Sequence, residues 1–275
     1  MRVHRINDIT VIRDEVQIPV LGVLPINAFV LHADEPVLVD TGRPVMREQF
    51  LDALSSVIDP AEIRWIWLTH PDRDHMGSLM DVLRIAPQSR LVTNFMGFGY
   101  LGVEFEIPPH RVHLLNPGQS LSVGGGHTLR AFRPPLYDSP MTLGFFDEST
   151  GTCVASDCFG GPLPSLDAAD VDDIGDIDPA DVRAAQLVWA AADSPWVCTV
   201  DPAKFATTYD EFCRFAPELV LSTHLPPARG HVDTLVDMLG EAPHAQPVSL
   251  PDQVALEAML AGVMPDQTPA TPVPA

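Results

Sequence analysis

Residues 68–77 carry the side chains best suited to chemistry in this chain. The stretch reads LTHPDRDHMG and places four potential metal ligands, His70, Asp72, Asp74 and His75, within six residues. It follows an apolar run at residues 63–68, so a buried strand would end here, where open α/β sheets bind ligands. In an extended turn, residues 70 and 72 point one way and residues 74 and 75 reach a second point nearby. This favours two adjacent metal ions; the alternative is a polar turn whose aspartates cap a helix.

Four segments, in order, resemble the metallo-β-lactamase-fold superfamily. Residues 70–75 are similar to the family hallmark His-x-His-x-Asp-His. Val37–Gly42 resembles the early strand and turn, whose aspartate, here Asp40, supports the site from beneath. Ala155–Asp157 resembles the late strand that ends in a metal-bridging aspartate, and Leu221–His224 resembles the last strand with the final histidine ligand. The resemblance implies an α/β fold, an αββα sandwich of two mixed sheets flanked by helices.

The chain departs from the family pattern at two positions. Asp72 stands where the hallmark has its second histidine, and an acidic residue there resembles the oxygen-binding di-iron branch, the catalytic core of flavodiiron proteins. That branch follows its bridging aspartate with a small residue, Phe and Gly, as Asp157-Cys158-Phe159-Gly160 does here. The family's middle histidine is missing from residues 133–140, where Asp138 lies nearest the vacancy and Tyr137 comes next. An oxygen ligand from either would keep the site closed.

The resemblance therefore implies ligands for two metal ions, with one aspartate shared between them. One ion would be held by His70, Asp72, Asp157 and Asp138, and the other by Asp74, Asp157 and His224. His75 is either a ligand of the second ion, as in the family's hydrolases, or a supporting neighbour, as the di-iron branch implies. Up to four carboxylates with two or three imidazoles favour iron, and manganese and zinc remain open. Because the middle histidine is missing, the alternative is a degenerate site that binds one metal ion or none.

Three functions are consistent with this site. The first is a di-iron oxidoreductase that binds or reduces dioxygen, nitric oxide or peroxide. The second is a hydrolase of an ester, thioester, lactone or phosphoester, with a metal-bound hydroxide and with Asp74 and His75 as catalytic residues. The third is a non-enzymatic sensor of a metal or ligand. Flavodiiron enzymes carry a flavodoxin-like domain that supplies electrons, and too few residues follow the motifs for one. We therefore expect no bound flavin, and either a separate reductase as partner or a role as a sensor.

Hydrophobic patterning predicts the elements that position these residues. Strands are expected at residues 9–12, 26–31, 36–40, 63–68, 90–93, 111–115, 127–132, 142–146, 152–156 and 219–222, and helices at 43–58, 77–85, 179–192 and 202–215. Strands that alternate with helices predict a sandwiched α/β arrangement. Without a repeat or linker, we expect one domain over residues 1–262 and a proline-rich disordered tail over residues 263–275.

The charge of the chain excludes several kinds of partner. Its 275 residues include 16 Lys+Arg and 37 Asp+Glu, a formal net charge of −21, which disfavours nucleic acids and anionic membranes. The sequence has no apolar run long enough to span a membrane and no signal-peptide pattern at its start. Its four cysteines form no CxxC pair, as is typical of reduced thiols. We expect a cytoplasmic protein that acts on a small molecule, and a homodimer remains open.

Other patterns receive structural interpretations. Residues 97–102 match G-x-G-x-x-G, but Pro108 and Pro109 prevent a long helix after them, so we expect a glycine-rich loop lining the pocket. The aspartates between residues 170 and 181 resemble a calcium loop without its closing Glu. There we expect a solvated acidic loop that could act as a lid over the metal site. The cysteines have apolar or strand neighbours and are expected to be buried, inert thiols.

Overall fold

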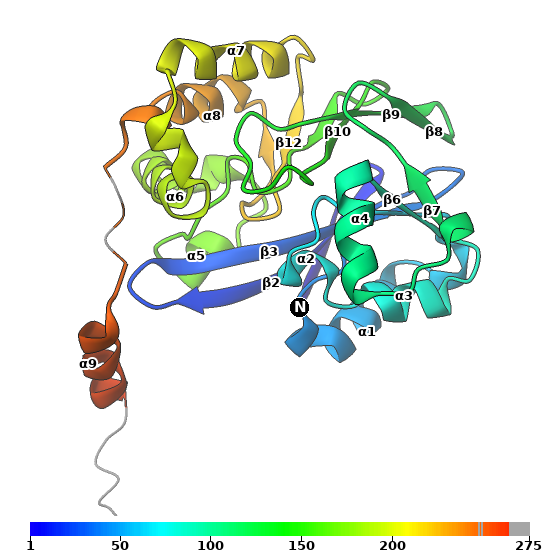
Figure 1. Cartoon of the computed structure of the whole chain (residues 1–275), viewed down its shortest axis with the longest axis horizontal. Coiled ribbons are helices and arrows are strands. Elements are labelled where there is room, and N and C mark those ends of the chain that lie inside the picture. Colours follow the sequence, from blue (N-terminus) through cyan, green and yellow to red (C-terminus); the bar gives the residue numbers. More distant parts are fainter. Residues whose placement is uncertain (247, 249, 264–275) are drawn as a thin grey trace, which may run out of the picture.

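Two mixed sheets form the centre of the computed structural model, which describes residues 1–246, 248 and 250–263 (Figure 1). The first sheet has seven strands that follow one another in chain order, antiparallel as far as β4 and parallel from β4 to β7. These strands are β1 (Arg2–Ile6), β2 (Ile9–Ile18), β3 (Gly22–Leu31), β4 (Val37–Val39), β5 (Trp65–Trp67), β6 (Arg90–Thr93) and β7 (Val112–Leu114).

The second sheet has six strands and one parallel pair, β11 beside β12. Its order is β13 (Ala228–Arg229), β12 (Leu219–Leu221), β11 (Thr152–Val154), β10 (Gly144–Asp147), β9 (His127–Phe132) and β8 (Ser120–Gly124). The remaining neighbours pair antiparallel. Each sheet therefore combines both kinds of pairing, as the resemblance implies.

Apolar side chains on both faces of the strands build the layers. Along β3, Phe29 packs into a core between the two sheets, whereas Val30 points into a second core on the outer face of the first sheet. Because successive side chains of a strand point to opposite faces, a run that is apolar at every position is buried on both sides. Phe145 of β10 and Trp67 of β5 meet in the core between the sheets, edge to face, with ring centroids 4.8 Å apart.

Helices cover the outer face of each sheet, which completes the expected αββα sandwich (Figure 1). The first sheet is covered by α1 (Arg47–Val57), α2 (Arg73–Met76), α3 (Leu79–Ile85) and α4 (Phe95–Glu104), and the second by α6 (Pro179–Asp193), α7 (Pro202–Cys213) and α8 (Val232–Leu239). The shorter α5 (Leu166–Ala169) and the late α9 (Gln253–Val263) complete the described helices. None of them has both the length and the apolar composition needed to cross a bilayer.

Several expectations about loops and termini were wrong or fall outside the described residues. The glycine-rich loop expected at residues 97–102 is part of helix α4, because Asn94 caps its start by accepting from the Gly97 amide at 2.8 Å and Leu101 is buried on the sheet. The prolines lie beyond the end of this helix. Strands β1, β8 and β13 were not expected. Of the cysteines expected to be buried, Cys213 is exposed. The predicted tail begins at the last residue of α9, and residues 264–275 lie outside the described range.

The acidic segment at residues 170–181 is attached to the body of the protein. Arg2 pairs with Asp170 and Asp172, each at 2.9 Å, and the Arg229 amide donates to Asp173 at 3.0 Å. These contacts tie the segment to the first strand and to β13. A lid role for it stays a prediction.

Candidate metal centre

The ends of four strands bring the predicted site residues together. Asp40 directly follows β4, and His70 lies three residues beyond its parallel neighbour β5. Asp157 and His224 each lie three residues beyond the parallel strands β11 and β12, which pair in register at Val154 and Leu221. Because parallel neighbours end at the same edge of a sheet, these side chains meet between the two sheets.

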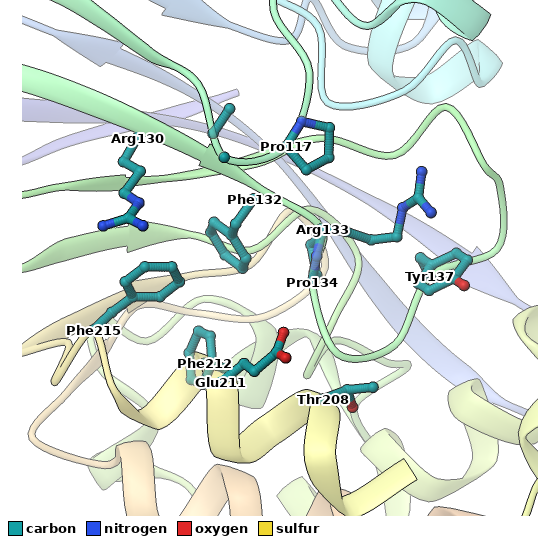
Figure 2. Close-up of a pocket in the computed structure, with 12 residues that line it drawn as sticks. Pro117, Arg130, Phe132, Arg133, Pro134, Tyr137, Thr208, Glu211, Phe212 and Phe215 are labelled. Atoms are coloured by element: carbon teal, nitrogen blue, oxygen red, sulfur yellow. The ribbon is translucent and has the colours of Figure 1, made fainter. Parts of the chain in front are cut away.

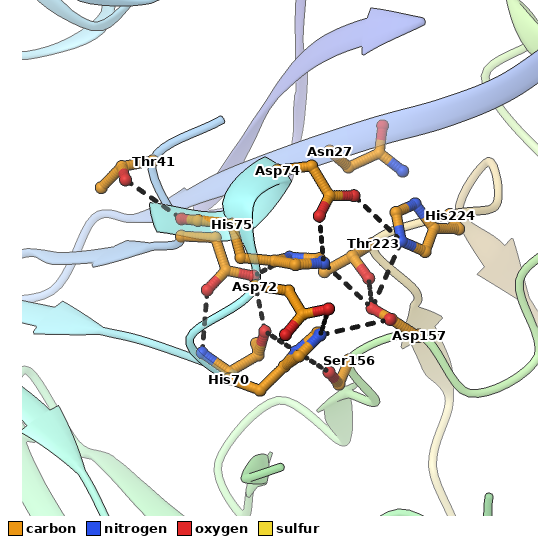
Figure 3. A network of polar contacts seen from close by, with 12 residues as sticks. Asn27, Thr41, His70, Asp72, Asp74, His75, Ser156, Asp157, Thr223 and His224 are labelled. Carbon is orange, nitrogen blue, oxygen red and sulfur yellow. Dashed lines mark hydrogen bonds and ion pairs between the residues drawn. The ribbon is translucent and has the colours of Figure 1, made fainter. Parts of the chain in front are cut away.

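Asp157 stands at the middle of this group (Figure 3). One of its carboxylate oxygens, Oδ2, lies 3.4 Å from Nε2 of His70. The other, Oδ1, lies 3.3 Å from Nε2 of His75 and 3.4 Å from Nε2 of His224. The two oxygens of one buried carboxylate thus face two different sets of side chains.

On the Oδ2 side, His70 is joined by two further carboxylates. Its Nε2 lies 4.0 Å from Oδ2 of Asp72 and 3.9 Å from Oδ2 of Asp138. The three side chains are close enough to share one metal ion. Asp138 is oriented by Thr142, whose hydroxyl donates to its Oδ1 at 3.0 Å. The structure therefore brings Asp138, the residue that the sequence placed nearest the missing histidine, beside His70.

On the Oδ1 side, Asp74 faces two imidazoles. Its Oδ1 lies 3.6 Å from Nε2 of His75, and its Oδ2 lies 3.5 Å from Nε2 of His224. These three side chains form a second group that can hold a metal ion. His75 thus points its Nε2 into the site, as a ligand would.

Hydrogen bonds at the opposite nitrogen fix the orientation of each imidazole. Nδ1 of His75 donates to Oδ2 of Asp40 at 3.0 Å, and Nδ1 of His224 donates to the Pro25 carbonyl at 2.8 Å. Nδ1 of His70 lies 3.2 Å from the hydroxyls of Thr69 and Ser156. Such partners fix the tautomer and direction of metal-binding histidines. All three rings therefore present Nε2 to the same space.

The residues of this centre fit two metal ions. Nε2 of His70 and of His75 are buried and have no hydrogen-bond partner among the described residues. A buried polar atom without a partner costs about 1–3 kcal/mol, which a coordinated metal would relieve. Three imidazoles and four carboxylates, His70, His75, His224, Asp72, Asp74, Asp138 and Asp157, surround the two positions. A donor set so rich in oxygen suits hard cations such as iron or manganese.

The carboxylates and imidazoles of the centre shift one another's pKa values. Burial opposes ionisation of Asp157, but the three imidazoles hold its pKa well below its usual value. Burial would lower the pKa of His75 and His224, yet neighbouring carboxylates, chiefly Asp74 for the first and Asp157 for the second, raise both, that of His224 to about 9. The pKa of Asp74 is lowered by these imidazoles despite burial. Metal binding must therefore displace protons.

Tyr137 is not brought into the centre. Its ring packs against Trp196, with centroids 5.1 Å apart, and the Arg133 guanidinium lies 5.1 Å from the centroid of the Tyr137 ring (Figure 2). The Trp196 indole donates to the Tyr137 carbonyl at 2.7 Å, which fixes the backbone there. The supporting role predicted for Tyr137 therefore has no counterpart in these contacts. Its neighbour Asp138 lies beside His70 instead.

Helix α6 contributes two residues that sequence reasoning missed. The Trp189 ring lies against His224, with centroids 5.8 Å apart. Asp193 lies one helical turn further on, and burial together with the carboxylates of Asp157 and Asp138 raises its pKa to about 7. No spacing in the sequence connects this helix with the metal motifs, so only the packing reveals these neighbours.

Comparisons with known proteins agree with this geometry. Residues 21–168 match the metallo-beta-lactamase superfamily. The chain is 29% identical to diflavin flavoprotein A 1 of Synechocystis sp. over 153 residues, 56% of this chain and 26% of that protein. It is 30% identical to flavo-diiron protein FprA2 of Clostridium acetobutylicum over 130 residues, 46% of this chain and 32% of that protein. The chain thus spans about a quarter to a third of the length of these relatives.

A solved structure shows the same fold over most of the chain. The rubredoxin oxygen:oxidoreductase of the anaerobe Desulfovibrio gigas superposes with a TM-score of 0.76 at 19% sequence identity. The superposition covers 90% of this chain and 63% of that protein. The two proteins therefore share the αββα sandwich over most of this chain, and not only at the short motifs.

Proposed function

The chain belongs to the metallo-β-lactamase superfamily, and we propose that it is a di-iron protein that binds or reduces dioxygen, nitric oxide or peroxide. The position of Asp157 carries this proposal, because its two oxygens face two separate ligand groups. The relatives named as diflavin and flavo-diiron proteins support iron as the metal. Replacement of two family histidines by Asp72 and Asp138 also favours a hard cation.

The proposed ligands divide between the two ions. His70, Asp72 and Asp138 would hold one ion, Asp74, His75 and His224 the other, and Asp157 would bridge them. Two ferrous ions, when bound, can supply one electron each to a small oxidant. The side chain of Asp72 is 56% exposed, against 17% for Asp138 and 9% for Asp157. The oxidant would therefore approach beside Asp72, where the centre meets solvent.

We also propose that electrons come from a separate flavin-bearing reductase. The support is the similarity to a diflavin flavoprotein of Synechocystis sp., whose name indicates bound flavin. Titration of the iron-loaded protein with a reduced flavodoxin tests this step under anaerobic conditions. Sedimentation of the same sample measures whether two copies of the chain associate.

Metal content tests the central proposal. Protein produced without added zinc should contain two irons per chain and absorb visible light in air, and this absorption should bleach on reduction. Nitric oxide and dioxygen consumption would then be measured with the reduced protein. Two zinc ions per chain without visible absorption would replace the di-iron proposal with the hydrolytic one.

The placement of His75 favours a hydrolase as the second candidate. Its Nε2 lies 3.3 Å from Asp157 and 3.6 Å from Asp74, inside the second ligand group rather than behind it. Asp74 would then orient a metal-bound hydroxide toward an ester, thioester, lactone or phosphoester. Zinc-loaded protein assayed on such substrates tests this reading. His75→Ala should abolish turnover by the zinc-loaded protein if the protein is a hydrolase. In the di-iron protein the same substitution should lower iron affinity, because the proposed ligand set includes His75.

A further inference from the structure

Asn27, on β3, lies beside the turn that carries the proposed metal ligand His224 (Figure 3). Its side-chain nitrogen Nδ2 donates to the Ser222 carbonyl at 3.0 Å and to the Leu225 carbonyl at 2.8 Å. Its backbone amide donates to the Thr223 carbonyl at 2.8 Å. One residue of the first sheet therefore holds the backbone on both sides of His224, in a turn that follows β12 of the second sheet.

The turn held by Asn27 serves one side of the metal centre. His224 belongs to the ligand group that faces Oδ1 of Asp157, and the Thr223 hydroxyl donates to that same oxygen at 2.6 Å. The other ligand group, around His70, is carried by different loops. Asn27 is 2% exposed, so water has little access to its hydrogen bonds. A change at Asn27 is therefore expected to affect one metal position and to spare the other.

Arg13 fixes the direction of the Asn27 amide. The two residues lie directly opposite each other in the pairing of β2 with β3, and Nε of Arg13 donates to Oδ1 of Asn27 at 3.2 Å. Because a guanidinium only donates hydrogen bonds, the amide oxygen must face Arg13 and the amide nitrogen must face the turn. Nη1 of Arg13 donates to the carbonyls of Ala169 and Val171, at 2.9 Å and 2.7 Å. The orientation of Asn27 is thus fixed from outside the metal centre.

The charge of Arg13 is buried among neutral acceptors. These acceptors are the amide of Asn27 and two backbone carbonyls, and Nη2 of Arg13 is buried without a hydrogen-bond partner among the described residues. Arg13 is 1% exposed, and although burial lowers its pKa to about 10, it remains charged at neutral pH. A buried charge is costly unless it is paired. A carboxylate at position 27 would therefore give Arg13 a counter-charge.

We propose that Asn27 is a positioning residue for one of the two proposed metal ions, the ion on the Oδ1 side of Asp157. Asn27 holds the backbone on both sides of His224, so that Nε2 of this ring stays directed at Asp74. Arg13 orients Asn27 for this task. Partners behind a metal ligand typically change metal affinity by about 10- to 100-fold. The inference rests on the proposed di-iron centre and adds a residue that distinguishes its two positions.

Asn27→Asp tests the proposal on the full chain, because it keeps the shape of the side chain and replaces the amide nitrogen with an oxygen. The two turn carbonyls would then face a carboxylate, whereas Arg13 would gain an ion-pair partner. In anaerobic competition with a chelator, the affinity for one ferrous ion should fall about 10- to 100-fold. Urea unfolding should show that the metal-free variant is at least as stable as the unmodified protein. A merely structural role would lower the stability of the metal-free protein together with both affinities.

Two ligand substitutions identify which ion is weakened. In His70→Ala, the remaining ferrous ion would be held by the group that contains His224, and adding Asn27→Asp should weaken its binding about 10- to 100-fold. In His224→Ala, the remaining ion would be held by the group around His70. Adding Asn27→Asp there should change the affinity by less than about threefold, because the side chain that Asn27 positions is already gone.

Asn94→Asp is the matched control for a new carboxylate in a buried place. Asn94 is also 2% exposed, and its side-chain nitrogen donates to the carbonyls of Pro140 at 3.4 Å and Met141 at 2.8 Å. This loop carries Asp138, which belongs to the ligand group around His70. In the His70→Ala background, Asn94→Asp should therefore change the affinity for the remaining ion by less than about threefold.

The outcomes separate this proposal from the one on which it rests. If the unmodified protein bound fewer than two ferrous ions, the di-iron centre would be refuted, and the positioning role with it. If two ions bound and Asn27→Asp weakened neither, or weakened the remaining ion equally in both ligand-substituted backgrounds, the centre would stand and the role of Asn27 would be refuted. Equal weakening by the Asn94→Asp control, or a loss of metal-free stability in Asn27→Asp, would also refute that role.

Discussion

Replacement of Asp157 by asparagine should remove the shared ligand of the two metal ions while keeping the shape of the side chain. The side chain of Asp157 is 9% exposed, and its oxygens lie 3.3–3.4 Å from Nε2 of His70, His75 and His224. Its Oδ1 also accepts a hydrogen bond from the Thr223 hydroxyl at 2.6 Å. The substitution therefore removes one negative charge at a point equally close to both ligand groups.

The expected loss of metal affinity follows from the contact of Asp157 with both ligand groups. An interaction with a charged group contributes about 1.5–3 kcal/mol, which corresponds to about 10- to 100-fold in affinity. Because one oxygen of Asp157 faces each group, both ions lose one such interaction. The combined affinity for the pair should fall by about 100- to 10,000-fold, if the two losses add.

Metal retention against a competing chelator measures this loss. The variant should keep fewer than two metal ions per chain under conditions in which the unmodified protein keeps both. Asp147→Asn is a matched control, because Asp147 is 1% exposed and pairs with His127 at 2.7 Å in another part of the second sheet. Retention of two ions by Asp157→Asn, with affinity within threefold of the unmodified protein, would refute the assignment. Equal loss in the Asp147→Asn control would point to general destabilisation.

Three further predictions concern other residues of the metal centre. Asp40→Asn should lower metal affinity about 10- to 100-fold, since His75 loses the charged acceptor that orients its ring. Chelator competition measures this affinity, and an unchanged value would contradict the prediction. Asp72→His should shift metal selectivity from iron toward zinc, measured by loading from an equimolar mixture, and an unchanged preference would mean that Asp72 is not a ligand. The raised pKa of His224, about 9 against 6.5 unfolded, stabilises the metal-free protein fully below pH 6.5, and this contribution is lost as the pH rises through 9. Urea unfolding should therefore show stability falling across that window, and a profile without such a fall would contradict the pKa assignment.

The layers of the fold were largely predictable because they depend on short-range patterning. The apolar run around Ile66 indicated a strand buried on both faces, and β5 lies inside the sheet as expected. Asp178 before Pro179 indicated a helix start, and its side chain accepts from the Ala180 amide at 2.9 Å. Pattern arguments failed at α4, where three glycines followed by Pro108 and Pro109 suggested a loop. Burial of Leu101 against the first sheet outweighs the low helix propensity of those glycines.

The sequence alone determined the family and the types of residue available to the site. The order of the motifs, from Asp40 through residues 70–75 to Asp157 and His224, is a property of the chain and could be read directly. The acidic identity of position 72 was equally visible. These features predicted the sandwich fold and a donor set rich in oxygen.

Only the tertiary structure decided how the metal-binding side chains divide between the two ligand groups and which residues surround them. Asp138 turns toward His70 while Tyr137 turns toward Trp196, because the Trp196 indole holds the carbonyl between them. The proximity of α6 to His224 arises from packing between segments distant in sequence. Distances between side chains depend on how strands and helices pack in three dimensions, and residue order alone does not specify that packing.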